Sequence, residues 1–329
     1  MAENKRFFYG WLILLTCILI MGLGYAPLVS CASLFTKPVT EDLGFTRSGY
    51  ALVSTIAALM MAFMSPFIGK IMSKPYMHKA LVVCMIGNCL AYYCYSFAST
   101  LPQFYVTAAC IGFFECGSTM IPVSVLITNW FRKKRGLVMS IAMVGSSIGG
   151  TILSPIIGNL IASQGWRFTY KAVGITRLVI LVPLVLLVIR RTPADMGTKA
   201  YGADEEGETG KARKTEREWN VSLKEVKKKP MFWCFVLGCT LISATAAVIT
   251  QIPASVMDAG YATTTAASIA SLYLFIAIPG KLVLGHIYDR YGVKAGILFG
   301  NTMFFLSVIC LIFIKHQRLC SIAYFTALV

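Results

Sequence analysis

Long apolar runs dominate this sequence and restrict it to a fold of membrane-spanning helices. Runs of about 20 residues or more are long enough for a helix to cross a hydrocarbon core of about 30 Å. Nine such runs lie at residues 8–30, 47–71, 78–98, 102–128, 136–163, 168–189, 231–257, 263–285 and 294–314. A tenth begins near residue 319 and reaches Val329 after about a dozen residues, too few to span. The sequence therefore predicts an all-α polytopic membrane protein with nine complete transmembrane helices and part of a tenth.

Composition agrees with this prediction and gives no sign of an enzyme. Hydrophobic residues make up 57% of the chain and charged residues 13%, against roughly 45–50% and about 25% in soluble domains. The sequence has no H-E-x-x-H motif, no Walker loop and no cysteine spacing typical of zinc sites. The eleven cysteines lie almost all within apolar runs, where cysteine behaves as a small hydrophobic residue. We expect no catalytic residues, no cofactor and no metal.

The basic residues predict how the chain is oriented in the membrane. The net charge is +16. With the N-terminus in the cytoplasm, most Lys and Arg fall on the cytoplasmic side, and the opposite side holds Lys37, Arg47, Arg167, Lys171, Lys315 and Arg318. This asymmetry follows the positive-inside rule. It predicts a multi-pass protein of the plasma membrane, with the N-terminus and the central linker in the cytoplasm, and it explains the charge without nucleic acid as a partner.

A polar linker divides the apolar runs into two sets. Residues 1–191 hold six runs, residues 192–230 form a cytoplasmic linker rich in charge and glycine, and residues 231–329 hold the second, incomplete set. A basic loop follows the second run of each set. It reads G-K-I-M-S-K-P-Y-M-H-K from Gly69 and G-H-I-Y-D-R-Y-G-V-K from Gly285. Its recurrence at matching places indicates an internally duplicated bundle, the architecture of many transporters.

Several pieces of the sequence resemble the major facilitator superfamily. The Asp-Arg loop from Gly285 resembles the signature loop of that superfamily. Four other pieces are similar to its oxalate/formate antiporter and monocarboxylate transporter branch: Y-G-W from Tyr9, E-D-L-G-F-T-R-S from Glu41, N-W-F-R-K-K-R-G from Asn129 and G-W-R-F-T-Y from Gly165. The resemblance implies a monomeric bundle of twelve helices in two six-helix halves. This sequence would then be a C-terminally truncated form, open to lipid on one wall, from which we expect weak or no transport.

The second copy of the loop predicts a contact that holds the bundle closed on one side. Gly285 allows two helices to approach and Gly292 permits a tight turn. Asp289 can accept the N-terminal charge of a neighbouring helix or pair with Arg290. In the resembling superfamily this loop is thought to latch the cytoplasmic side, whereas a plain charged turn is the simpler interpretation. The residues assigned to this gating role are Gly285, Asp289, Arg290, Gly292 and Lys294.

The fifth apolar run carries a face of small residues and a proline. Gly145, Gly149 and Gly150 permit close contact between helices, and Pro155 invites a bend. The run resembles the glycine-proline helix of the branch and, less closely, that of drug antiporters. Helix packing alone is the competing interpretation.

Ionisable residues at membrane depth are costly and therefore mark candidate functional positions. Lys281 stands where the resembling branch commonly has an arginine that pairs with the substrate carboxylate; alternatively, its ammonium reaches the nearby membrane surface. Glu115 is a candidate for carrying a coupled proton or for a structural carboxylate. Arg177 is expected near the outer end of its span. Tyr25, Gln251 and Tyr273 are polar enough to line a substrate cavity, although the tyrosines can equally serve packing.

These features predict a secondary transporter of small organic anions that works by alternating access. Monocarboxylates or an oxalate/formate type of exchange are the expected substrates, coupled to a second anion or to a proton. Proton symport is less expected, because the eighth run has no acidic residue before Lys281. One alternative is a drug or neutral-solute efflux carrier of the same superfamily. Another is a non-transporting sensor or scaffold, or an inactive fragment.

Overall fold

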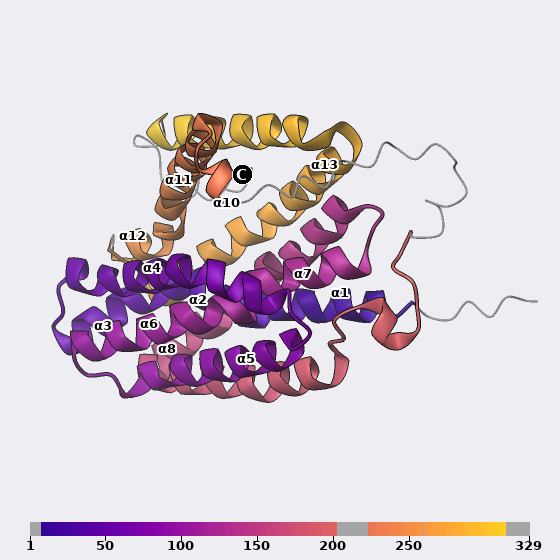
Figure 1. Cartoon of the computed structure of the whole chain (residues 1–329). Helices are drawn as coiled ribbons and strands as arrows, with labels where there is room; N and C mark the ends of the chain where they lie inside the picture. Colours follow the sequence, from indigo (N-terminus) through magenta and orange to yellow (C-terminus); the bar gives the residue numbers. More distant parts are fainter. Residues whose placement is uncertain (1–7, 203–222, 259, 314–329) are drawn as a thin grey trace, which may run out of the picture.

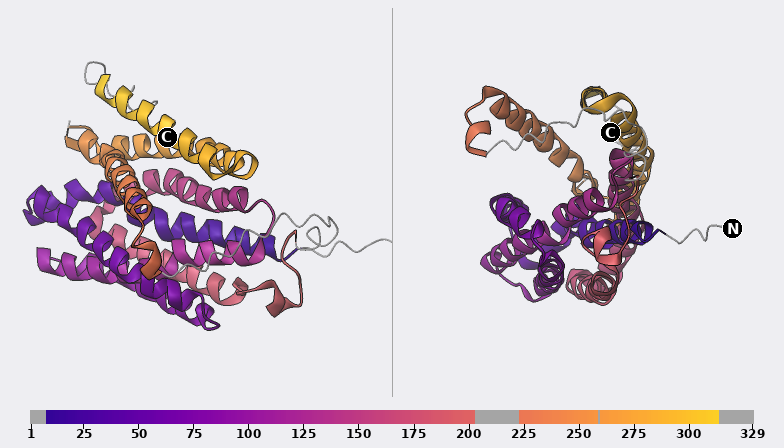
Figure 2. Two further views of the ribbon diagram at one scale, coloured as in Figure 1. Left: turned by 45° about the horizontal axis from the view of Figure 1, so that its top comes forward. Right: turned by 45° about the vertical axis from the view of Figure 1, so that its right-hand side comes forward.

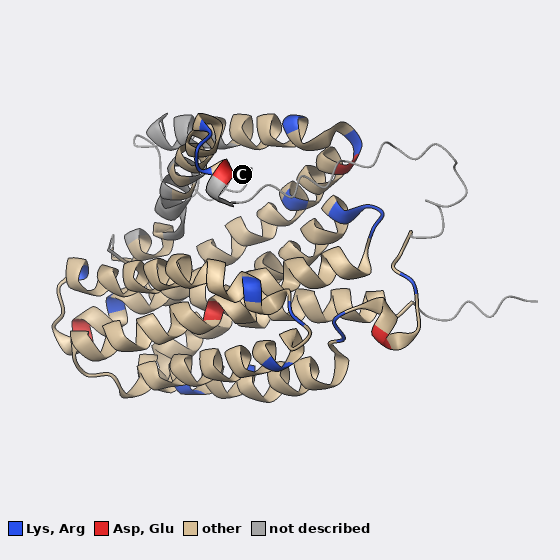
Figure 3. Ribbon diagram, viewed as in Figure 1, with Lys and Arg blue, Asp and Glu red and all other residues tan. Residues whose placement is uncertain are grey.

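The computed structural model describes residues 8–202, 223–258 and 260–313, and these form an all-α fold (Figure 1). The one bridge of β type in this part of the chain joins Phe131 to Tyr201. Most of the ribbon carries no charged residue (Figure 3), as expected of helices that face lipid or one another. The prediction of an all-helical membrane protein is confirmed.

The second, third and fourth spans lie close to the predicted positions, whereas the first continues to Leu43, beyond its predicted end at residue 30. The first is interrupted and consists of α1 (Gly10–Leu19), the π-helical segment η1 (Ile20–Tyr25), α2 (Ala26–Val29), η2 (Ala32–Phe35) and α3 (Thr36–Leu43). The next are α4 (Arg47–Met72), α5 (Met77–Cys94) with η3 (Tyr95–Phe97), and α6 (Leu101–Ser118) followed by α7 (Met120–Trp130). Thr46 caps α4 by accepting from the backbone N–H of Gly49 at 3.2 Å, as a threonine at an N-cap does.

The remaining helices include two long ones that each contain a glycine break. They are α8 (Arg135–Val188), η4 (Pro193–Met196), α10 (Leu223–Val226), α11 (Pro230–Thr250), α12 (Ile252–Asp258) and α13 (Thr263–Phe313). Gly165 in α8 has φ 80° and Gly292 in α13 has φ 83°, values that glycine adopts readily. Each break lies between two predicted spans, so α8 and α13 each hold two of them.

Six helical stretches in the described residues are long and apolar enough to cross a membrane: Gly10–Leu43, Arg47–Met72, Met77–Phe97, Leu101–Trp130, Arg135–Val188 and Thr263–Met303. A count of nine spans with part of a tenth stays a prediction, because the last predicted run lies outside the described residues. So does most of the predicted linker, of which residues 192–202 and 223–230 are described.

The apolar core of the described residues consists of two large clusters at opposite ends of the bundle and a third, small one formed by Ala270, Tyr273 and Leu274 of α13. We call the end that carries Gly136 and Asp289 the Asp289 end, and the end that carries α3 the Lys37 end. The cluster toward the Asp289 end includes Ile13, Met72, Met77, Trp130 and Val185, and the cluster toward the Lys37 end includes Phe35, Tyr92, Phe104, Trp166 and Tyr170. Between them, at the middle of the spans, the N-terminal half buries polar side chains.

The two halves of the chain meet along α8 and α13, which run antiparallel (Figure 2). Residues of the two helices face one another in order from the Asp289 end toward the Lys37 end, where Gly158 faces Ala267.

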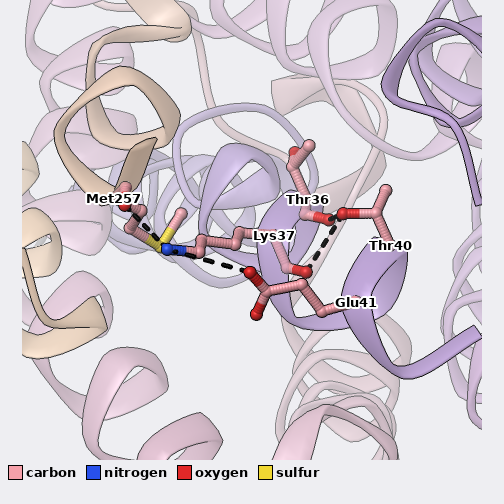
Figure 4. A network of polar contacts seen from close by, with 5 residues as sticks. All are labelled: Thr36, Lys37, Thr40, Glu41 and Met257. Atoms are coloured by element: carbon pink, nitrogen blue, oxygen red, sulfur yellow. Dashed lines mark hydrogen bonds and ion pairs between the residues drawn. The ribbon is translucent and has the colours of Figure 1, made fainter. Parts of the chain in front are cut away.

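A second contact between the halves lies at the Lys37 end. There, Nζ of Lys37 donates to the carbonyl of Met257 at 2.8 Å and lies 3.8 Å from a carboxylate oxygen of Glu41 (Figure 4). The lysine thus places its positive charge at the C-terminal end of α12, where cations are favourable.

Candidate functional site: a lysine between the two halves

Lys281 of α13 points into the contact with α8. Its ammonium donates to Oγ of Ser147 at 2.7 Å, to Oγ of Ser146 at 2.9 Å and to the carbonyl of Met143 at 3.2 Å. An ammonium has three N–H donors, so these acceptors use all of them. The interpretation in which Lys281 extends to the membrane surface is therefore wrong for this structure.

The position of Lys281 along the helices places it deep in the bundle. Ser146 lies about 15 Å from Gly136 along α8, at 1.5 Å per residue. That distance is half of a hydrocarbon core of about 30 Å. Among the described residues, no carboxylate forms an ion pair with Lys281, whose three contacts are all to neutral oxygens. The site is thus a positive charge at mid-depth, surrounded by neutral acceptors and lying between the two halves.

Asp289 lies two turns further along α13 and closes the same helix contact at its end. Its Oδ1 accepts from the backbone N–H of Gly136 at 2.9 Å, and its Oδ2 accepts from that of Leu137 at 2.7 Å. The carboxylate therefore caps α8, whose own N-cap residue Lys134 provides no side-chain cap. Of the two partners expected for Asp289, the structure selects the neighbouring helix; Arg290 instead lies 5.5 Å from the centre of the Tyr291 ring.

The two glycines assigned to the gating motif serve a close helix contact at Gly285 and a turn at Gly292. A Cβ on Gly285 would be 2.2 Å from Oγ of Ser140, and Gly292 adopts its predicted turn with φ 83°. Lys294 is exposed just beyond that turn. The expectations of a close approach at Gly285 and a turn at Gly292 are met.

The small face of the fifth run serves two different contacts. A Cβ on Gly145 would lie 2.3 Å from the carbonyl oxygen of Ile18, and one on Gly149 would lie 2.2 Å from that of Gly22. Gly150 faces the other half, where a Cβ would be 2.5 Å from the side chain of Leu274. Packing of α8 on α1 and η1 therefore accounts for the first two glycines, and packing on α13 accounts for the third.

Pro155 supports the contact between the halves through a missing hydrogen bond. Proline has no backbone N–H, so the carbonyl four residues earlier in its helix loses its helical donor. That carbonyl belongs to Thr151, and Oγ of Ser271 in α13 donates to it at 2.7 Å. In return, Oγ1 of Thr151 donates to the carbonyl of Ser271 at 3.4 Å. The proline thus leaves the carbonyl of Thr151 without a donor in its own helix, and the hydroxyl of Ser271 in the other half donates to it instead.

The other predicted site residues are distributed over the bundle. Tyr273 is buried in α13, two turns from Lys281 toward the Lys37 end. Tyr25 is half-buried in η1, close to Glu115. Gln251 is exposed in the turn between α11 and α12. The structure therefore places Lys281 and Tyr273 on one helix at the contact between the halves, and it does not assemble all four substrate-binding candidates into one site.

Glu115 is buried at the middle of its span, as expected, with 6% of its surface exposed. Arg177 is not at the outer end of its span as predicted. It is 1% exposed and lies midway along the part of α8 that follows Gly165. Its guanidinium donates to the carbonyl of Gly24 at 2.9 Å and to Oδ1 of Asn88. Neither Asn88 nor the serines beside Lys281 were singled out from the sequence, because serine and asparagine in apolar runs are common.

Membrane-spanning helices in two sets, joined around a half-buried lysine, define a polytopic membrane protein. The chain belongs to the Major Facilitator Superfamily, whose family model matches residues 12–329. Its relatives are transporters, which confirms both the predicted family and the prediction that the chain is not an enzyme.

Curated relatives point to the predicted branch at low identity. The chain is 24% identical to "Monocarboxylate transporter 2" of Homo sapiens over 229 residues, covering 68% of this chain and 45% of the relative. It is 26% identical to "MFS-type transporter pytF" of Aspergillus terreus, covering 63% of this chain and 62% of the relative. It is 26% identical to "Monocarboxylate transporter 4" of Gallus gallus over 50% of this chain and 35% of the relative. The chain thus spans less than two thirds of the length of these relatives.

One solved structure is similar over the whole chain. It is a bacterial homologue of the human lysosomal transporter Spinster in an inward-facing, unoccupied conformation, and the TM-score is 0.69 at 16% identity. The match covers 100% of this chain and 74% of the other chain. At this identity the similarity supports the superfamily fold.

Proposed function

We propose that the protein is a secondary transporter of small organic anions, with Lys281 as the residue that holds the substrate carboxylate. The single observation that carries this proposal is the position of Lys281. Its ammonium lies at mid-depth between the two halves and contacts only neutral acceptors among the described residues. The similarity to monocarboxylate transporters adds support for an anionic substrate.

The chemistry of the three acceptors suits exchange with a carboxylate. An unpaired charge at the centre of a bilayer costs about 2.5 kcal/mol or more, so a bound anion lowers the energy of the ammonium. The hydroxyls of Ser146 and Ser147 both accept and donate hydrogen bonds. They can rotate to donate to carboxylate oxygens while Lys281 supplies the charge-assisted bond, which is the stronger kind.

Alternating access then follows from where the site lies. Lys281 belongs to α13 and its acceptors belong to α8, so rocking of one half against the other separates or joins the parts of the site. A lysine that is bound to an anion no longer needs all three protein acceptors. Substrate binding therefore weakens one contact between the halves while Asp289 holds the Asp289 end closed. We propose exchange of anions or proton coupling as the driving force.

We favour anion transport over the alternative of drug or neutral-solute efflux. That alternative was suggested by the glycine-rich fifth run, and those glycines pack against Ile18, Gly22 and Leu274. The further proposals concern the setting of the protein: a monomer in the plasma membrane, with the N-terminus and the linker on the cytoplasmic side. No observation favours the sensor or scaffold role over transport.

Uptake into proteoliposomes tests the proposal. Labelled formate, lactate and oxalate are offered separately to vesicles that contain the protein. We expect saturable uptake of at least one of them, its loss in Lys281→Ala and partial retention in Lys281→Arg, because arginine keeps the charge but changes its geometry. The matched control is Lys79→Ala, which removes an exposed lysine at the start of α5. Unchanged uptake and apparent affinity in Lys281→Ala would show that the lysine only joins the helices.

A further inference from the structure

A layer of polar groups separates the two apolar clusters inside the N-terminal half. Glu115 stands midway along the span Leu101–Trp130, Asn88 midway along Met77–Phe97, and Arg177 midway between Gly165 and Val188. The carbonyl of Gly24 in η1 completes the layer. Four different spans thus contribute polar groups at one depth, where burial of such groups is most costly.

Several atoms of this layer have no hydrogen-bond partner in the part of the chain that the structure describes. They are Oε1 of Glu115, Nε and Nη1 of Arg177, Nδ2 of Asn88 and the hydroxyl of Tyr92. Leaving a buried polar atom unpaired is unfavourable, and native structures do so mostly for a reason. In this layer, an acceptor atom of Glu115 and donor atoms of Arg177 are therefore both without a hydrogen-bond partner among the described residues. The guanidinium of Arg177 also lies 4.9 Å from the centre of the Tyr92 ring.

Two irregular helix segments meet at this layer. In η1 the N–H of Ala26 bonds to the carbonyl of Met21, five residues earlier, which is the π-helical pattern. In the fourth span the helix breaks at Thr119, with φ −121° and ψ −98°. Gly24 of η1 faces Thr119, because a Cβ on this glycine would lie 3.6 Å from the Thr119 side chain. Single π-helical turns and breaks occur often at functional sites.

The charged and titratable neighbours of Glu115 come from several elements. Arg177 of α8 and Tyr25 of η1 lie close enough to interact electrostatically with it, as do Tyr95 of η3 and Cys116 of its own helix. The charges of α4 are Arg47 and Lys70, and those of α5 include Lys79; all of these stand toward helix ends. Arg177 is thus the one permanent charge in the described part of the layer.

We infer that Glu115 and Arg177 form a proton-binding site within the N-terminal half that couples proton movement to the motion of the first span. In one state the Glu115 carboxylate is negative and balances Arg177 across the layer. In the other state, a proton is bound to the Glu115 carboxylate as an O–H group. The guanidinium of Arg177 is then stabilised by its hydrogen bonds to the carbonyl of Gly24 and to Oδ1 of Asn88. The same O–H bond breaks when the proton leaves, so the step needs no reactant other than the proton. Because the guanidinium of Arg177 donates to the carbonyl of Gly24 in η1, the change in charge balance acts on the π-helical part of the first span.

Infrared difference spectra of the reconstituted protein test the site without any substrate. A protonated carboxyl gives its own carbonyl band, which disappears when the acid ionises. We expect such a band to titrate in the unmodified protein, in Glu115→Asp and in the control Glu41→Gln, which removes an exposed carboxylate. The band should be absent from Glu115→Gln, a replacement of nearly equal shape that should still fold. A band that survives in Glu115→Gln, or the absence of a titrating band in the unmodified protein, overturns the inference.

Transport measurements test the coupling, and only this arm rests on the proposed function. An imposed pH gradient should stimulate anion uptake by the unmodified protein and by Arg177→Lys, which keeps the charge. Stimulation should be lost in Glu115→Gln and in Arg177→Gln, while anion exchange without a gradient persists in Glu115→Gln. If the band titrates but no anion is taken up, the anion proposal fails and the proton site stands. If Glu115→Gln responds to the gradient like the unmodified protein, the coupling role is wrong.

Discussion

Asp289 caps the helix that begins beside Gly136, although 153 positions separate the two residues in the sequence. The cap joins the two halves of the protein at one end of the α8–α13 contact, where the helix has no side-chain cap of its own. A negative group at a helix N-terminus is stabilised by the unpaired N–H groups and by the helix dipole. The contact is therefore an ordinary helix cap in its chemistry, but it joins two halves of the bundle that are far apart in the sequence.

Removal of this cap should loosen the Asp289 end. Asp289→Ala is expected to lower the stability of the purified protein by about 1 kcal/mol, typical of a lost cap, and to increase labelling of a cysteine placed at Ser140 beneath it. The control is Asp195→Ala, which removes the carboxylate that accepts from the N–H of Thr192 at 2.9 Å within the linker. If both variants raise labelling at residue 140 equally, the cap does not hold the halves together.

Pro155 and Ser271 should show energetic coupling in a double-mutant cycle. Ser271→Ala leaves the buried carbonyl of Thr151 without a donor, which should cost about 1–3 kcal/mol. Pro155→Ala restores the backbone N–H that can bond to the same carbonyl. The double variant should therefore lose less stability than the sum of the two single variants, by about 0.5 kcal/mol or more. Thermal unfolding in detergent measures all three, and simple additivity would refute the explanation.

The glycine face of α8 should tolerate no added methyl group. In Gly149→Ala the new Cβ would lie 2.2 Å from the carbonyl oxygen of Gly22, so α8 and η1 must move apart, and overpacking of this kind costs about 1–3 kcal/mol. Gly69→Ala is the matched control, because nothing lies within 4 Å of its Cβ and alanine favours a helix. The expected result is a lower unfolding temperature for the first variant alone. Equal unfolding temperatures would contradict the close approach.

The orientation of the protein is testable with single cysteines in a background without the native ones. Met196→Cys is exposed at the Asp289 end, and Glu41→Cys is exposed at the Lys37 end. The distribution of basic residues predicts that an impermeant reagent added to intact cells labels residue 41 and leaves residue 196 unlabelled. Detergent should make both accessible. Labelling of residue 196 from outside would reverse the proposed topology.

The sequence by itself determined the elements of this protein. Apolar runs with few charges placed the second, third and fourth spans within a few residues of their ends, because in lipid every backbone group must bond within its own helix. Gly292 marked a break by the same local reasoning, since glycine readily adopts its positive φ. The depth of Glu115 also followed from its position along a run, and the family followed from short motifs in order.

Only the tertiary structure decided which groups meet. Asp289 had two plausible partners, and Lys281 had two plausible destinations, because a sequence does not reveal the register between helices of different halves. Arg177 was placed at the outer end of its span because a buried arginine needs partners that one helix does not reveal, and its partners Gly24 and Asn88 come from two other spans. The acceptor created by Pro155 has meaning only with Ser271 beside it. Local hydrogen bonding fixes the helices, whereas side-chain fit between distant segments fixes the site.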